Sequence, residues 1–183
     1  MKWRIFYILC MGLVLAGLVH IAIVLLIPKY GTRDAWAFLS SRTDLFTFSR
    51  LNPEETGSAI SEVDPFFTYG VCRFDLDEAP LKMAGPLTST FWSASVFDNN
   101  GAVVYSLNNR TAIENRLDLL IVNPLQTLEL RDSQPEEIET SVVIEAGIQE
   151  GFVIVRVLQP DESWTSDSDA FFSKIDCDRY LIN

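Results

Sequence analysis

The chain has one histidine among its 183 residues, and this scarcity removes several common active-site designs. His20 lies in a long apolar run near the N-terminus, so the rest of the chain has no imidazole to act as a general base. A Ser-His-Asp site, a Cys-His site or a histidine-rich zinc site therefore cannot form there. Glycine-rich phosphate loops are also absent from the sequence. We accordingly predict no catalytic residues, no cofactor site and no metal site.

Cysteine is also scarce, with three residues in the chain. Cys10 belongs to the apolar run, whereas Cys72 and Cys177 lie far apart in the remainder. In an oxidising compartment these two residues can close a loop of roughly 100 residues, which stabilises a fold by about 4 kcal/mol in the chain-entropy model. Two separately buried thiols are the alternative, and the sequence leaves both open. The disulfide between Cys72 and Cys177 is a prediction to test.

Positive charge is in short supply outside the first few residues. The formal net charge is −11, and Lys2 and Arg4 are the only charged residues before Lys29. The chain beyond them carries 12 of the 14 basic residues and all 25 acidic ones. A surface of this sign repels phosphate backbones, so nucleic acid is excluded as an expected partner.

The long apolar run extends from Ile5 to Ile27. As a helix it measures roughly 35 Å, enough to cross a bilayer core of roughly 30 Å. The run is longer than the apolar part of a usual signal peptide, and no small-x-small cleavage site precedes Pro28. These features predict an uncleaved signal anchor. The positive end at Lys2 and Arg4 is expected to stay in the cytoplasm, which places the acidic domain on the far side of the membrane.

Three regions follow from this interpretation. Residues 1–28 are the cytoplasmic N-terminus and transmembrane anchor, residues 29–63 a juxtamembrane connector with short helices, and residues 64–183 a β-rich domain. One connector helix is expected at Asp34–Ser40, with Trp36 and Phe38 in the interfacial belt of the membrane. A second helical piece is expected to end near Val63.

Residues 90–110 predict a β-hairpin, because apolar and polar side chains alternate on both sides of Asn100-Gly101. Asn-Gly is well suited to the positive φ angles of a two-residue hairpin turn. With that loop, the cross-strand partners are Val96 with Tyr105 and Ala94 with Leu107. A loop at Asn99-Asn100 would change the partners but keep the same faces, whereas a three-residue loop would oppose apolar and polar side chains.

Further strands are predicted at intervals punctuated by turn residues: Phe66–Asp75, Pro80–Ala84, Leu117–Val122, Gln126–Leu130, Ser141–Glu145 and Phe152–Leu158. Residues 146–151 read as a second hairpin connection. A helix capped at Asp167–Asp169 is expected to continue to about Arg179. The predicted fold is mainly β: an antiparallel β-sandwich-like domain with a short C-terminal helix, preceded by one N-terminal transmembrane helix.

Several of these segments together resemble bacterial membrane-anchored proteins of the domain of unknown function 1254 family. The resemblance spans roughly residues 64 to 164. The motifs that carry it are Asp64-Pro65, Gly70-Val-Cys-Arg-Phe-Asp-Leu76, Trp92-Ser-x-Ser-x-Phe-Asp-x-x-Gly101, Tyr105-Ser-Leu-Asn-x-Arg110, Leu117-Asp-Leu-Leu120 and Glu150-Gly-Phe-Val153. The resemblance implies an inner-membrane anchor, a periplasmic β-rich domain and a proteobacterial origin. It implies no activity, cofactor or catalytic residue.

Six residues form a candidate ligand-binding or structural cluster: Arg73, Asp75, Trp92, Tyr105, Arg110 and Arg156. An arginine within an apolar strand, such as Arg156, indicates a paired carboxylate, with Asp75 or Glu145 as candidates. Trp92 and Tyr105, with Trp164, are candidates for a platform that stacks on sugar rings. Packing of the first two in the core is the alternative, because they share the apolar face of the predicted hairpin.

Two functions are consistent with this sequence. The favoured one is a non-enzymatic periplasmic module, held to the inner membrane by one helix, that binds another envelope protein or a cell-wall glycan. The alternative is a carboxylate-based enzyme acting on cell-wall glycans, because glycoside cleavage needs only two acids. Its candidate residues lie near predicted strand ends and are Asp64, Asp75, Asp98, Asp118 and Glu150.

Overall fold

The computed structural model describes residues 2–51, 64–86, 90–133, 138 and 140–182. The chain divides into two compact units, Met1–Asp34 and Ala35–Asn183, and the second is called the body below. The predicted helical piece that ends near Val63 lies outside the described residues.

The first element is the helix α1, Lys2–Ser40. Among the described residues, Lys2–Leu26 is the one helical segment whose length and composition suit a membrane crossing. A signal sequence near an N-terminus can also be long and apolar enough to meet these criteria. The predicted N-terminal apolar helix is confirmed as a helix.

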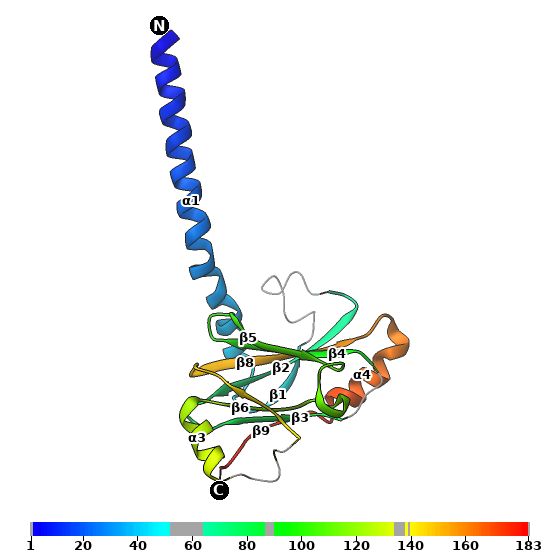
Figure 1. Cartoon of the computed structure of the whole chain (residues 1–183). Helices are drawn as coiled ribbons and strands as arrows, with labels where there is room; N and C mark the ends of the chain where they lie inside the picture. The colour runs from blue at the N-terminus through cyan, green and yellow to red at the C-terminus, as the bar shows by residue number, and fades with distance from the viewer. Residues whose placement is uncertain (1, 52–63, 87–89, 134–137, 139, 183) are drawn as a thin grey trace. The chain divides into compact units, whose positions relative to one another are not determined.

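The body is mainly β, as predicted (Figure 1). Its elements in chain order are β1 (Phe48–Leu51), β2 (Phe67–Asp75), β3 (Leu81–Ala84), β4 (Trp92–Asp98), β5 (Val103–Asn108), η2 (Ile113–Asn115), β6 (Asp118–Val122), α3 (Pro124–Ser133), β7 (Val142–Glu145), β8 (Glu150–Leu158), η4 (Glu162–Trp164), α4 (Thr165–Phe172) and β9 (Asp176–Arg179). Sheet A has the order β1-β2-β8-β4-β5 and sheet B the order β7-β6-β3-β9. All neighbours are antiparallel except β6 and β7.

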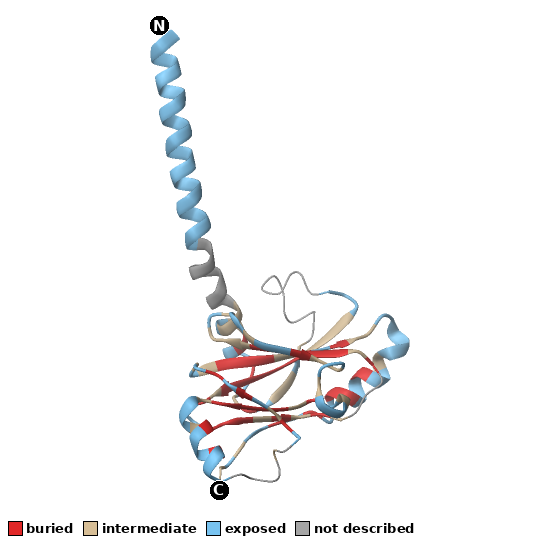
Figure 2. Cartoon of the chain, viewed as in Figure 1, coloured by how far each residue is buried: buried red, intermediate tan, exposed pale blue. Residues whose placement is uncertain are grey.

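The core lies between the two sheets, where Figure 2 shows buried residues along the strands of both. Side chains alternate between faces along each strand, so every second residue points into this layer. On β4 the inward residues are Trp92, Ala94 and Val96, all fully buried. Their neighbours on β8 are Val153, Val155 and Val157. The face of sheet A that points away from sheet B is called the outer face below.

The predicted hairpin is present as β4 and β5. Val96 pairs with Tyr105 and Ala94 with Leu107, as predicted. The loop is longer than the expected two residues, because β4 ends at Asp98 and β5 begins at Val103. The pairing register shifts between Val96 and Phe97, which is a β-bulge or similar irregularity. Within the loop, Gly101 has a φ of 79°, which glycine adopts without strain.

The predicted strand at Gln126–Leu130 is wrong, because these residues belong to the helix α3. The Asn123 side chain accepts a hydrogen bond from the Gln126 backbone N–H, and the Gln126 side chain accepts one from the Asn123 N–H. This reciprocal pair is a capping box. Pro124 follows at the first helical position, where its missing N–H has no cost.

The predicted C-terminal helix is present but shorter than expected. The helix α4 ends at Phe172, and Asp176–Arg179 forms the strand β9 instead. Strand β9 pairs with β3 and places Cys177 opposite Met83, both inside the core. The segment Asp176–Arg179 is strongly charged and has only a weak preference for helix. The packing of Cys177 in the core therefore decides that the segment forms a strand.

The predicted hairpin connection at residues 146–151 is wrong. Residues 146–149 lead from β7 in sheet B to β8 in sheet A. Strand β8 has β2 on one side and β4 on the other, so it has no free edge for β7. The connection therefore joins the two layers of the sandwich.

Candidate functional site

The five acids of the glycan-enzyme alternative do not gather at one place. Three of them lie at one end of sheet A, where Asp75 pairs with Glu150 and Asp98 pairs with Gly151. Asp64 precedes the opposite end of β2, and Asp118 begins β6 in sheet B. The cross-strand pair Asp75 and Glu150 is thus the one register pair among these acids.

Each of the five carboxylates has a structural contact. Three of them accept hydrogen bonds from nearby backbone N–H groups in two turns and one loop. Asp64 accepts from Phe66 at 3.0 Å, and Asp75 accepts from Asp77 at 2.9 Å. Asp98 accepts from Asn100 at 2.9 Å and from Ala102 at 2.7 Å. Lys82 Nζ lies 2.6 Å from Asp118 Oδ1, and Asn99 Nδ2 lies 3.5 Å from Glu150 Oε2. Such contacts are typical of carboxylates that stabilise turns or form ion pairs.

The six residues of the predicted cluster are spread over both faces of sheet A and its edge. Trp92 is buried in the core, where its ring stacks on Phe171 with a centroid distance of 6.5 Å. Its faces are therefore closed to a sugar ring. Tyr105 lies on the edge strand β5 and is 40% exposed, and Arg110 is exposed in the turn that follows.

Arg156 lies on the outer face of β8, and its contacts differ from the expected carboxylate pairing. Its Nε donates to Ser93 Oγ at 2.6 Å, and its guanidinium lies 5.3 Å from the centre of the Phe67 ring. The ion pairs among the described residues are Arg50 with Asp169, Lys82 with Asp118, and Arg179 with Glu78. Arg156 therefore packs as a surface cation over an aromatic ring.

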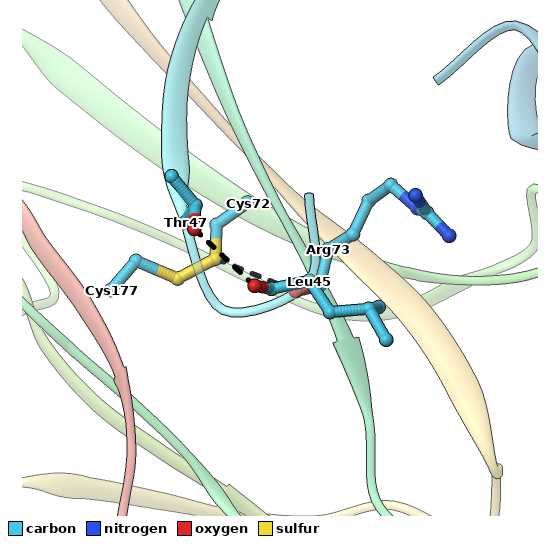
Figure 3. The surroundings of a disulfide bond; sticks show 5 residues. All are labelled: Leu45, Thr47, Cys72, Arg73 and Cys177. Carbon is cyan, nitrogen blue, oxygen red and sulfur yellow. Dashed lines mark hydrogen bonds between the residues drawn. A yellow bond between two sulfur atoms is a disulfide. The ribbon is translucent and has the colours of Figure 1, made fainter. Parts of the chain in front are cut away.

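Cys72 on β2 and Cys177 on β9 are joined by a disulfide in the structure (Figure 3). Their Cα atoms are 6.5 Å apart, within the usual range for a disulfide, and both residues are buried in the core. The bond links sheet A to sheet B. Figure 3 also shows the Arg73 side chain pointing away from Cys177. Cys72 and Arg73 are neighbours on β2, and neighbouring side chains of a strand point to opposite faces of the sheet.

Arg73 contacts the segment that leads into β1. Its Nη1 donates to the Thr43 carbonyl at 2.7 Å, and its guanidinium lies 4.5 Å from the centre of the Trp36 ring. The backbone carbonyl of Arg73 accepts from the Phe46 N–H at 2.8 Å. Trp36 and Phe38 are partly buried against Leu39, Val71 and Phe152, and their place in the interfacial belt of a membrane stays a prediction.

The electrostatic surroundings of Arg73 are unusual for an arginine. Its side chain is almost fully buried, and no described carboxylate lies within 4.0 Å of the guanidinium. The Nε atom is buried without a hydrogen-bond partner. Burial lowers the pKa of Arg73, while the nearby charges of Glu150 and Asp44 act in the opposite direction. Arg73 remains protonated at neutral pH, so the body holds an incompletely compensated cation.

An apolar surface not found by sequence reasoning lies on α3 and β7. Between these elements is a cavity of ≈ 640 Å³ lined by Thr127, Leu130, Arg131, Ile138, Val143 and Glu145. Val143 on β7 lines the cavity and is 42% exposed. Leu125 and Leu128 lie on the outward face of α3, are 72% and 58% exposed, and are not among the residues that line the cavity. The signal that could have located this surface is the capping box at Asn123 and Gln126, which marks α3 as a helix.

The chain was compared with protein-family models, curated proteins and solved structures. The family model for the "Protein of unknown function (DUF1254)" matches residues 43–177. The chain belongs to the DUF1254 family. No curated protein matches it. The match includes Arg73 and all the strands except the last two residues of β9, and the resemblance to the DUF1254 family is thereby confirmed.

Two solved structures resemble this DUF1254 chain in fold. The VPA0106 protein from Vibrio parahaemolyticus has a TM-score of 0.58 at 11% identity, covering 82% of this chain and 36% of that one. An uncharacterised protein from Burkholderia cenocepacia has a TM-score of 0.50 at 11% identity, covering 88% of this chain and 42% of that one. The DUF1254 chain thus spans about two fifths of each structure's length.

Proposed function

We propose that this DUF1254 protein is an inner-membrane-anchored periplasmic module that binds another envelope protein or a cell-wall glycan without catalysing a reaction. The apolar segment Lys2–Leu26 supports the anchor, because it is long enough to cross a bilayer. Lys2 and Arg4 precede the segment's apolar centre, which favours a cytoplasmic N-terminus and a periplasmic body.

The apolar surface of α3 and β7 carries the proposal. Leucines on the outward face of a short helix gain nothing for the fold, because their side chains stay in water. Leu125 and Leu128 are such residues on α3, and Val143 is an exposed apolar side chain of β7 that lines the cavity together with Arg131 and Glu145. Exposed apolar side chains and a cavity with both apolar and charged lining residues are typical of binding surfaces.

The contacts of the acids support a role without catalysis. A glycan-cleaving pair needs one carboxyl group held ready to donate a proton and another free to act as base or nucleophile. Asp64, Asp75 and Asp98 instead accept hydrogen bonds from nearby backbone N–H groups, and Asp118 pairs with Lys82. None of these four lines the cavity between α3 and β7.

A pair of fusions at residue 183 tests the proposed location. Alkaline phosphatase, which is active only after export, is expected to be active when fused there, and green fluorescent protein is expected to be dark. The converse pair of results would place the body in the cytoplasm and overturn the proposed location.

Photo-crosslinking in intact cells tests the binding role. A photoreactive residue at Leu128 or Val143 is expected to give a discrete adduct with a partner protein, whereas the same residue at Arg110, exposed beyond β5, is expected to give none. If the partner is a glycan, the purified protein is expected to sediment with cell-wall sacculi and Leu128→Asp to reduce the bound fraction. No adduct and no sedimentation would contradict the binding role.

A further inference from the structure

The first residues of the body, Ala35–Thr43, lie on the outer face of sheet A and are called the strap below. Leu39 is fully buried there against Val71 of β2 and Phe152 of β8. Trp36 and Phe38 of the strap are partly buried against the same cluster. The strap therefore covers apolar side chains that would otherwise face water.

This outer cluster is separate from the core between the sheets. Its buried members are Leu39, Val71 and Phe152, and none of them belongs to the larger cluster that includes Trp92 and Val153. Removing the strap would expose Val71 and Phe152 but leave the contacts between the sheets in place. Such a division allows the strap to open locally without global unfolding.

Few bonds hold the strap to the sheet. Among the described residues, no backbone–backbone hydrogen bond joins Ala35–Thr43 to a strand. The first such contact along the chain comes after the strap, at Phe46, whose N–H donates to the Arg73 carbonyl. Phe46 itself is buried in the core between the sheets and so marks the fixed end of the strap.

Arg73 is the polar residue that fastens the strap. It donates to the Thr43 carbonyl at 2.7 Å and lies 4.5 Å from the centre of the Trp36 ring, so it touches both ends of the strap. Its buried Nε has no partner and no described carboxylate lies within ion-pair distance. Closing of the strap is therefore favoured by a charge-assisted hydrogen bond and a cation–π contact of Arg73. It is opposed by the cost of removing the Arg73 guanidinium from water.

We propose that Ala35–Thr43 is a releasable strap, clamped by Arg73, that uncovers the apolar outer face of sheet A when it opens. Within the strap, Ala35–Ser40 form the C-terminal end of α1 and residues 41–43 follow it. The inference does not rest on the proposed periplasmic location or on the surface of α3 and β7.

Hydrogen exchange of the full chain in detergent micelles, read by mass spectrometry, tests this inference. A peptide covering residues 36–43 is expected to exchange at least ~100-fold faster than one covering β8, because it opens locally. Low concentrations of urea are expected to raise the strap's rate less steeply than the rate of β8, because opening of the strap exposes less surface than global unfolding. Exchange of both peptides at one common rate would overturn the proposal.

The variant Arg73→Met tests the clamp. Loss of the hydrogen bond to Thr43 and of the contact with Trp36 is expected to raise the strap's exchange rate roughly tenfold. Exchange of β8 is expected to stay as in the wild type. The matched control is Arg156→Met, which removes the same groups from an outer-face arginine that contacts Ser93 and Phe67 instead.

A second variant keeps the inference testable if Arg73→Met fails to fold. Trp36→Ala removes the strap's ring over Arg73 and is expected to speed exchange of residues 36–43 while leaving β8 unchanged. Equal acceleration of both peptides would show that the strap is part of the cooperative fold. An unchanged strap rate in a folded Arg73→Met would also refute the clamp.

Discussion

The two faces of sheet A carry apolar clusters of very different construction. The inner face meets sheet B in one continuous core that includes Trp92, Val153 and the disulfide between Cys72 and Cys177. The outer face has two buried apolar residues, Val71 and Phe152, beneath a short helical segment that contributes a third, Leu39. Antiparallel sheets usually leave one face to water. Here a local cover allows apolar residues on that face, and stability is unevenly divided between the two clusters.

The largest expected effect comes from removing the centre of the inner cluster. Trp92→Ala deletes a fully buried ring stacked on Phe171 and is expected to lower the free energy of unfolding by about 3–5 kcal/mol. Urea denaturation followed by far-UV circular dichroism measures it. Trp164→Ala, at a partly exposed ring, is the control and is expected to change stability by less than about 1 kcal/mol. Equal losses would contradict the difference in burial.

The next largest effect is expected from the bond across the inner cluster. Cys72→Ala with Cys177→Ala is expected to cost about 2–4 kcal/mol, because the loop between them, 105 residues apart in sequence, is no longer closed in the unfolded chain. Reductant is expected to destabilise the wild type similarly and to leave the double variant unchanged. Cys10→Ser is the control. Complete alkylation of both thiols in native protein without reductant would show that the bond does not form in the cell.

A matched pair of valines compares the two faces directly. Val153 on the inner face and Val71 on the outer face are both fully buried. Val153→Ala is expected to cost about 2 kcal/mol of unfolding free energy, while Val71→Ala is expected to cost about 1 kcal/mol or less, because the strap opens before the fold does. The measurement is chemical denaturation of both variants under one condition. Equal costs would place the two clusters in one cooperative unit.

The smallest effect lies outside both clusters, at the exposed Asp161. Hydrogen bonds from the Ser163 hydroxyl and backbone N–H lower the pKa of this carboxyl below its usual range. A lowered folded-state pKa adds stability above the ordinary Asp value near 3.9, and this is lost as the pH falls through the folded value. Ser163→Ala is expected to raise the pKa toward ~3.9 in a carboxyl NMR titration. Ser166→Ala is expected to leave it unchanged.

The sequence predicted those parts of the fold in which local pattern and tertiary packing agree. The pairing of Val96 with Tyr105 followed from alternation, because a one-residue slip would turn every side chain to the wrong face. The bulge and the longer loop were not predicted, since alternation does not count loop residues. Leu128 and Leu130 alternate over too few residues to separate strand from helix, and the caps of α3 decided the outcome.

Tertiary proximity explains what the sequence could not show about the site. Arg73 was recognised as an arginine in apolar surroundings, but its contacts are with Trp36 and Thr43, about 30 residues earlier in the chain. Strand β9 has a single apolar inward residue, Cys177, so its pairing with β3 had no sequence pattern to reveal it. The exposed leucines of α3 could not be recognised from the sequence, because residues 126–130 were predicted to form a strand and not a helix.

The bond between Cys72 and Cys177 also has a mechanical consequence. A pull on the chain before β1 first meets β1 and then β2, where Cys72 passes the load through a covalent link to β9 in the other sheet. Separating sheet A from sheet B would then require breaking the disulfide bond as well as the contacts between side chains. In its oxidised form, the sandwich therefore resists tension as a single piece.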